Sequence, residues 1–375
     1  MRHPISATES TANFKKQGHS VNKKRIMIYG ANGYTGELIA REAVAKGYRP
    51  ILAGRNAKKL QPLAEELDLP AMAIGLDATE TLERTLRDID VVIHCAGPFS
   101  ATAEPMMRAC INAGTHYQDI TGEMEVYRAA HAMHAEAKGA GIVLCPGTGF
   151  DVIPTDCLAA ALHKAIPSAT HLTLGFDSNS AMSPGTAKTS IESLGVGGAV
   201  RRNGKIEIIG HGELTRQINF GRGEKFAVAI PWGDVATAYY STEIPNIEVY
   251  IPMSPRRAKK MKRMNSFRWL LRMQWVQNWL KGKVDKSVRG PSEEKRSEQQ
   301  TWVWGEVRND RRGERKIGRV VTANGYDVTV HGSLAVMEFL LDYKGNGGYF
   351  TPSKLCGSEL VERLPGSGTI KIGID

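Results

Sequence analysis

The first 150 residues alternate between short β-like runs and longer stretches of helical pattern. The runs read RIMIYG, PILAG, AMAIGL, DVVIHCAG, HYQDI and GIVLCPG, in that order along the chain. Strands that alternate with helices build a parallel sheet with helices on both faces. We therefore predict a doubly wound α/β sheet, in which ligands bind beyond the carboxyl ends of the strands.

The first run leads into a glycine-rich turn, GANGYTG. Gly30 lets the chain leave the strand sharply, and Gly33 leaves room for a ligand near the backbone. Gly36 lets the next helix lie close to the strand, and the free N–H groups at its N-terminus favour phosphate. A tight turn without a ligand would need similar glycines, but the surrounding alternation favours a bound dinucleotide. The residues expected to contact it here are Gly30, Ala31, Asn32, Gly33, Tyr34, Thr35 and Gly36.

The end of the second run distinguishes the two nicotinamide cofactors. NAD sites usually place a carboxylate there, which accepts from the ribose 2′-hydroxyl. This chain has Arg55 and Asn56 instead, and an arginine can form a bidentate pair with a 2′-phosphate. We therefore expect NADP(H). Asp77, after the third run, is either an acceptor for the adenine amino group or a helix N-cap.

The acid–base residues are less distinct in the sequence. No tyrosine is followed four residues later by lysine, so the Tyr-xxx-Lys pair of short-chain dehydrogenases is absent. Asp119 and Glu123 follow the fifth run, and Lys188 would polarise a carbonyl, so these three are the catalytic candidates. Glu123 is equally explained as a carboxylate that stabilises a helix dipole. Asp151 and Asp156 are equally explained as turn and N-cap residues.

Several motifs in linked order resemble the saccharopine dehydrogenase-like oxidoreductases. They are GANGYTG, LAGRN, VVIHCAGPF, ACINAGTHYQDITGE and CPGTGFDVIPTD, and the greatest likeness is to the branch that includes trans-acting enoyl reductases. The resemblance implies a Rossmann domain, an α+β substrate domain and a C-terminal helix that returns to the first domain. It also implies that Ala96, Gly97 and Pro98 lie beside the nicotinamide ribose.

The domain boundaries follow a change of pattern along the chain. We expect a disordered tail, the NADP-binding domain, the substrate domain and a returning C-terminal segment at 1–23, 24–155, 156–345 and 346–375. The tail is polar and has little to bury. Beyond about residue 170 the β-like runs become longer, which favours a mixed or antiparallel sheet over the nicotinamide. The last of these runs is IGRVVTANGYDVTV.

The net charge of +10 comes from one segment. Residues 256–289 contain twelve Lys/Arg and one acid, so the rest of the chain is nearly neutral. This argues against a nucleic-acid surface along the chain. We expect one inserted basic helix over 256–283, which either packs on the substrate domain or meets an anionic membrane. Its aromatic residues are Phe267, Trp269, Trp275 and Trp279.

These patterns predict an NADP(H)-dependent oxidoreductase that transfers hydride to an enoyl or oxo group of a lipid-like substrate. The second-half arginines gather at Arg201, Arg202 and in the basic segment, which does not suit a dicarboxylate such as saccharopine. The alternatives are a saccharopine-type dehydrogenase and a protein that senses NADP(H) without turnover. Five cysteines without a CxxC pair favour a cytoplasmic protein. Peripheral membrane contact and a homodimer are left open, and no metal or nucleic acid is expected.

Overall fold

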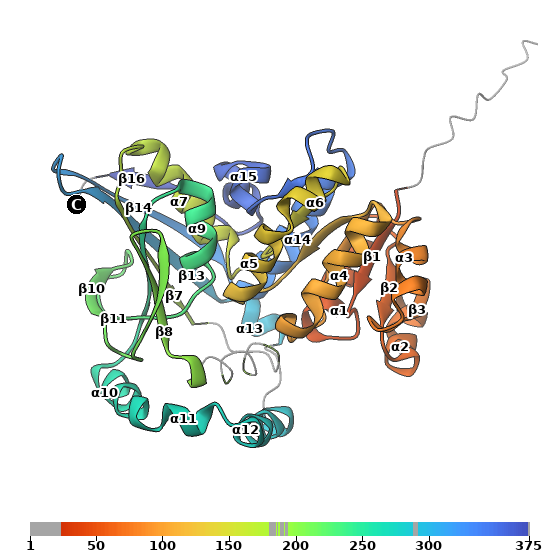
Figure 1. Cartoon of the computed structure of the whole chain (residues 1–375), viewed down its shortest axis with the longest axis horizontal. Helices are drawn as coiled ribbons and strands as arrows, with labels where there is room; N and C mark the ends of the chain where they lie inside the picture. Colours follow the sequence, from red (N-terminus) through yellow and green to blue (C-terminus); the bar gives the residue numbers. More distant parts are fainter. Residues whose placement is uncertain are drawn as a thin grey trace, which may run out of the picture.

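Two β-sheets organise the chain (Figure 1). The computed structural model describes residues 24–179, 185, 187, 191, 194–287 and 292–373. The first sheet has seven strands in the order β15-β6-β5-β4-β1-β2-β3, and the second has nine. Lys188 lies outside the described residues.

The first sheet is parallel throughout. Strands β1 to β6 coincide with the six β-like runs of the sequence, so the predicted doubly wound α/β fold is confirmed. The seventh strand, β15, was not predicted, because it contains two residues and carries no periodic pattern. The strands are β1 (Ile26–Tyr29), β2 (Ile51–Gly54), β3 (Ala71–Ala73), β4 (Val91–His94), β5 (His116–Asp119), β6 (Val143–Cys145) and β15 (Gly348–Tyr349).

Helices cover both faces of this sheet, which explains why β1 and β4 are buried along their whole length. Side chains of β1 alternate between two cores, with Ile26 and Ile28 in one and Met27 and Tyr29 in the other. The first core includes α1, α2 and α14, and the second includes α3, α4 and α5. The helices are α1 (Tyr34–Ala45), α2 (Ala57–Leu67), α3 (Thr79–Leu86), α4 (Phe99–Ala113), α5 (Met124–Ala132), α6 (His134–Gly139) and α14 (Gly325–Leu341).

Helix α14 corrects two sequence-based expectations. The β-like run was extended through GYDVTV, but the chain turns into a helix at Gly325 because the Asn324 side chain accepts from the backbone N–H groups of Tyr326 and Asp327. The helix also lies against α1 and the first sheet, although the sequence placed it in the substrate domain. Valine and threonine favour strands only weakly, and burial of the helix between neighbours outweighs that preference.

The second sheet is mixed and forms an α+β unit with two helices. Only the pairing of β7 with β12 is parallel among its described strand pairs. Helices α7 (Ile153–Ala165) and α9 (Asp234–Thr242) pack on one face. The strands are β7 (His171–Ser178), β8 (Gly198–Arg202), β9 (Lys205–Ile209), β10 (Thr215–Asn219), β11 (Glu224–Ala229), β12 (Asn246–Pro252), β13 (Gln300–Asn309), β14 (Glu314–Ala323) and β16 (Lys371–Gly373).

The C-terminal segment joins the two sheets rather than returning to the first alone. Strand β15 pairs with β6 of the first sheet, whereas β16 pairs with β14 of the second. Between them, α15 (Pro352–Cys356) and the 3-10 turn η2 (Ser358–Arg363) contact α7.

The basic segment is not the single helix that the sequence predicted. It is divided into α10 (Pro255–Met264), the 3-10 turn η1 (Asn265–Phe267), α11 (Arg268–Leu271) and α12 (Gln274–Ser287). At the break, the Asn265 side chain accepts from the backbone N–H of His211 and donates to its carbonyl. This pair fixes the end of α10 to the loop after β9. The short helix α13 (Glu293–Ser297) then leads into β13.

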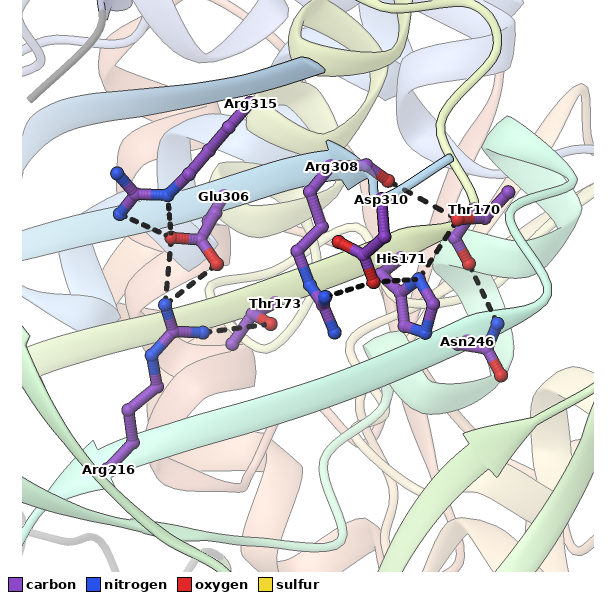
Figure 2. Close-up of polar contacts among 9 residues, drawn as sticks. All are labelled: Thr170, His171, Thr173, Arg216, Asn246, Glu306, Arg308, Asp310 and Arg315. Carbon is purple, nitrogen blue, oxygen red and sulfur yellow. Dashed lines mark hydrogen bonds and ion pairs between the residues drawn. The ribbon is translucent and has the colours of Figure 1, made fainter. Parts of the chain in front are cut away.

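The face of the second sheet away from α7, called the outer face here, carries a cluster of charged side chains (Figure 2). Glu306 of β13 is only 2% exposed and lies between two arginines. Arg216 donates to both carboxylate oxygens at 2.7 and 2.8 Å, and Arg315 donates to Oε2 at 2.9 Å. These arginines were overlooked when the sequence assigned the second-half arginines to Arg201, Arg202 and the basic segment.

Candidate dinucleotide and hydride-transfer site

The glycine turn is built as its spacing predicts. Gly30 has φ +86°, and a Cβ there would lie 2.7 Å from the backbone nitrogen of Ala96. A Cβ at Gly36 would lie 2.5 Å from the carbonyl oxygen of Gly30. Both positions therefore require glycine because the backbone is too close. At Gly33 the only neighbour is that carbonyl oxygen at 3.3 Å, so the site side of the turn is open.

The turn presents the start of α1 toward this open side. Gly33 is the N-cap of α1, and within the described part of the chain no side chain caps the helix. The N-terminus of a helix favours an anion through its backbone N–H groups and its dipole. The Tyr34 hydroxyl accepts from Arg296 at 3.0 Å, so the backbone of Tyr34 and Thr35, rather than the tyrosine ring, is the expected contact. Ala31 is fully buried, and Asn32 is exposed near Gly54.

Arg55 and Asp77 lie near each other beyond the ends of β2 and β3. Both are exposed, and both act on the Tyr29 hydroxyl: burial raises the pKa of Tyr29, Arg55 lowers it and Asp77 raises it. In the described residues no hydrogen bond or ion pair is recorded for the Arg55 side chain. Asp77 is not a helix N-cap, because Ala78 occupies that position in α3. The Asn56 side chain caps α2 by accepting from the backbone N–H of Lys59 at 3.3 Å.

The loop after β4 contributes the next part of the same edge. Ala96 packs against Gly30, as the clash distance above shows, and its carbonyl accepts from Thr102 Oγ1 at 2.6 Å. Gly97 and Pro98 follow, and Pro98 is the N-cap of α4. These residues stand directly beside the glycine turn, where a dinucleotide that binds the turn would pass.

The Glu123 carboxylate binds the N-terminus of α4. Its Oε1 accepts from the backbone N–H of Phe99 at 3.0 Å, and its Oε2 accepts from that of Ser100 at 2.7 Å. Both oxygens therefore stabilise the N-terminus of α4. The helix-dipole explanation predicted from the sequence fits this geometry, although the helix is α4 and not the one that Glu123 itself begins.

Asp119 is fully buried and fully engaged in hydrogen bonds. Its Oδ2 accepts from the Tyr117 hydroxyl at 2.6 Å, and its Oδ1 accepts from the backbone N–H groups of Thr121 and Gly147 at 3.0 and 2.9 Å. Burial raises the pKa of Asp119 to about 6, although these bonds lower it. The geometry fastens the loop after β5 to the loop after β6, and each carboxylate oxygen already accepts at least one hydrogen bond from the chain.

Asp151, in the loop between β6 and α7, has the opposite character. The residue is half-buried, and its Oδ2 lies 2.5 Å from where a Cβ of Gly122 would stand. Burial and the neighbouring charge of Glu123 raise the pKa of Asp151 to about 7. No hydrogen bond or ion pair is recorded for its side chain among the described residues. A carboxyl group that is half-protonated near neutral pH can donate or accept a proton.

An aromatic wall lies next to Asp151 along the chain. The ring of Phe150 meets that of Phe176 edge-on at 5.3 Å, and Phe176 contacts Trp232 at 4.7 Å between centroids. The Trp232 Nε1–H is buried and has no partner within the described ranges. A buried donor without a partner is uncommon in proteins and is one mark of a ligand site. The wall combines β7 with the loops before α7 and α9.

Two histidines that are three residues apart, His131 and His134, have structural contacts. His131 stacks on Tyr240 at 4.2 Å, and His134 Nδ1 accepts from the backbone N–H of Tyr349 at 3.1 Å. Over the ranges described above, no three or more His, Cys, Asp or Glu side chains are grouped to hold a metal. No described helix has the length and apolar character needed to cross a membrane.

A comparison of the chain with known protein families gives a match in the first sheet. Residues 26–145 match the model of the saccharopine dehydrogenase NADP binding domain. The match covers about a third of the chain. The predicted resemblance and the nicotinamide dinucleotide as cofactor class are thereby confirmed. The glycine turn, and an Arg55 side chain with no recorded partner among the described residues, fit such a ligand.

Two curated relatives share this domain at modest identity. A saccharopine dehydrogenase-like oxidoreductase of Mus musculus is 31% identical over 151 residues, which is 35% of this chain and 35% of the relative. A trans-acting enoyl reductase of Mycobacterium tuberculosis is 32% identical over 147 residues, which is 37% of this chain and 35% of the relative. The matched region therefore spans about a third of each relative.

Solved structures share the overall fold across both sheets. Saccharopine dehydrogenase (L-Glu forming) from Saccharomyces cerevisiae has a TM-score of 0.66 at 12% identity and covers 94% of this chain and 100% of its own. Homospermidine synthase from Legionella pneumophila, solved with NAD, has a TM-score of 0.64 at 9% identity and covers 94% and 92%. These similarities show that the α+β second domain, as well as the first, has a known architecture.

Proposed function

We propose that the protein is an NADP(H)-dependent reductase that acts on an enoyl or oxo group of a hydrophobic substrate, with Asp151 as the proton donor. The observation that carries this proposal is the state of Asp151. It is half-buried at the carboxyl edge of the first sheet, its pKa is raised to about 7, and it lies beside an aromatic wall. The sequence-based candidates Asp119 and Glu123 are engaged in structural hydrogen bonds instead.

The chain's own groups divide the binding work along this edge. The start of α1 holds the pyrophosphate through backbone N–H groups, and Arg55 pairs with the 2′-phosphate. Asp77 accepts from the adenine, and Gly97 and Pro98 let the nicotinamide ribose pass close to the backbone. Asn56 contributes through its position beside Arg55, since its side chain already caps α2.

The bound nicotinamide supplies the hydride. For an enoyl substrate, a C–H bond forms at the β-carbon, the π electrons move to the α-carbon, and Asp151 donates the proton that the α-carbon takes up. For an oxo group the same proton goes to oxygen. The carboxylate then takes a proton from water before the next turnover. Lys188 stays a candidate for polarising the substrate carbonyl.

The substrate class follows from what surrounds Asp151. Phe150, Phe176 and Trp232 offer apolar area and one unpartnered N–H. A dicarboxylic amino acid would need free arginines, but Arg201 is 5% exposed and donates to the carbonyls of Val235 and Gly204. On the outer face, Arg216 and Arg315 pair with Glu306. This distribution favours a hydrophobic chain over saccharopine.

We place this activity in the cytoplasm, with peripheral contact to an anionic membrane through 256–283 and with a homodimer as the alternative to a monomer. A saccharopine-type dehydrogenase and a sensor that binds NADP(H) without turnover are the competing functions. They differ in what they do to NADPH.

The test measures NADPH oxidation as the loss of NADPH fluorescence. The substrates are enoyl thioesters of increasing chain length and 2-oxo acids. We expect turnover that improves with chain length, because the aromatic wall gains contact with each methylene. Oxidation of saccharopine with NADP, without turnover of any thioester, would establish the amino-acid dehydrogenase. Tight NADPH binding without oxidation by any compound would establish the sensor.

A further inference from the structure

We propose that α10, α11 and α12 dock the protein onto an anionic lipid bilayer, with their exposed aromatic side chains inserted among the headgroups. The segment 256–283 is called the docking strip here. Figure 1 shows its helices in a row along one edge of the molecule, beneath the second sheet. Membrane binding by the docking strip is argued independently of the proposed function. Only the link between membrane binding and a lipid-like substrate rests on that function.

The docking strip exposes an unusual number of large aromatic side chains. Phe267, Trp269, Trp275 and Trp279 are 63%, 62%, 65% and 58% exposed. Single exposed apolar residues are ordinary, but a contiguous group of them marks an interaction surface. Tryptophan is the residue that prefers the headgroup region of a membrane, because its ring is apolar and its N–H is polar.

These aromatic residues face outward because the opposite side of the docking strip is fixed to the protein. Asn265 pairs with the backbone of His211, and Arg272 donates to the carbonyl of Gly195 at 2.8 Å. Gln277 donates to the carbonyl of Ile191 at 3.2 Å. Next to it, Val276 is only 8% exposed. Trp275 and Trp279, four residues apart on α12, therefore share the solvent side.

The charge of the docking strip suits an anionic surface. Residues 256–283 contain ten Lys/Arg and no Asp or Glu. The cations on α10 are exposed and pair with no acid of their own element. The Lys283 ammonium lies 3.7 Å from the centroid of the Trp279 ring, so cation and aromatic ring are presented together. Basic residues beside an apolar face are the signature of helices that lie in the membrane interface.

A bilayer fits this arrangement better than a nucleic acid. Six of the ten cations lie on α10, which has no aromatic ring, whereas the rings follow on η1, α11 and α12. Single-stranded nucleic acid instead needs stacking rings interleaved with cations along one groove. Met273, which is 37% exposed among these rings, offers nothing for a base to pair with but inserts readily into lipid.

The test is flotation of the full-length protein with vesicles of phosphatidylcholine, with and without about one-third phosphatidylglycerol. We expect binding to the anionic vesicles that weakens with salt. The double variant Trp275→Ala/Trp279→Ala should bind at least about tenfold more weakly because the inserted rings are lost. Lys259→Glu/Lys260→Glu should weaken binding at low salt, because the attraction to the headgroups is reduced.

Two variants away from the strip serve as controls. Phe339→Ala removes an exposed aromatic ring from α14, and Arg311→Glu/Arg312→Glu reverses two exposed charges at the turn between β13 and β14. Both should float like the unmodified chain. Equal losses in strip and control variants, or tighter binding to an oligonucleotide than to anionic vesicles, would overturn the proposal. NADPH affinity, measured in the same samples, reports separately on the proposed function.

Discussion

Charged side chains lie both at the carboxyl edge of the first sheet and on the outer face of the second sheet, but the partners of these charges differ. On the outer face, Glu306 is enclosed by Arg216 and Arg315, and every partner is supplied by the sheet (Figure 2). At the edge of the first sheet, no partner is recorded among the described residues for Arg55 or Asp151. A charged side chain whose partners come from the fold stabilises the fold. We propose that a charged side chain without such partners binds a ligand.

The same contrast separates neighbours within the first sheet. Asp119 and Asp151 both have a pKa raised by burial, to about 6 and about 7. Asp119 accepts three hydrogen bonds from the chain, and its shift is a consequence of its structural position. No such bond is recorded for Asp151 within the described part of the chain, so we propose that its raised pKa serves chemistry. A shifted pKa identifies a catalytic group only together with the geometry around it.

The largest effect is expected from Asp151→Asn. The substitution removes the proton donor but keeps the shape of the side chain, so turnover should fall about 10³-fold while NADPH binding stays unchanged. In the unmodified enzyme, kcat/KM for reduction should fall above about pH 7, because the carboxyl must be protonated to donate. Steady-state rates across pH measure both. An unchanged rate in the variant would remove Asp151 from the mechanism.

The stability of the same variant supplies its control. Because the folded state raises the pKa of Asp151, this group lowers stability as pH rises from about 4, its ordinary value, through about 7. Asparagine stays neutral, so Asp151→Asn should unfold at a higher temperature than the unmodified chain above pH 7. The difference should vanish in acid, where both side chains are neutral. Reduced thermal stability at all pH values would instead indicate a structural role.

The second effect concerns Arg55. Arg55→Asp removes a charge-assisted pair with the 2′-phosphate and adds repulsion, so NADPH affinity should fall about 100-fold, or about 2.7 kcal/mol. NADH affinity should change little, because NADH lacks that phosphate. Calorimetric titration of both cofactors measures this difference. Arg87→Asp is the matched control, since Arg87 lies at the end of α3 just before β4 begins, at the opposite edge of the sheet. Equal losses for both cofactors would contradict the assignment.

The sequence predicted the first sheet well because its strands are local patterns. Each of the strands β1 to β6 lies in a short β-like run of the sequence, and the glycine turn follows from spacing alone. Strand β15 and helix α14 were missed because tertiary contacts define them. A two-residue strand exists only through its pairing with β6, and Asn324 sets the start of α14 against a β-prone composition.

The candidate cofactor residues could be proposed from the sequence because they too belong to local patterns. Arg55 could be found because it follows β2 directly, where the ribose must lie. The contacts of Glu123 could not be predicted from the sequence, because its partners, the backbone N–H groups of Phe99 and Ser100, are more than twenty residues away. Asp151 was set aside as a turn residue. The feature that distinguishes it, burial against Gly122 near Glu123, exists only when the loops after β5 and β6 meet.

The smallest effect is expected on the outer face, and it completes the comparison. Glu306→Gln keeps one acceptor oxygen but removes the charge between Arg216 and Arg315, so the free energy of unfolding should fall by about 2 kcal/mol. The loss is limited because these arginines are 32% and 46% exposed and can turn toward water. NADPH affinity and turnover should stay the same. Denaturant unfolding measures the loss, with Glu224→Gln, an exposed residue of β11, as control. If Glu306→Gln impaired turnover while stability held, the division between charges completed by the fold and charges left for a ligand would fail at its clearest example.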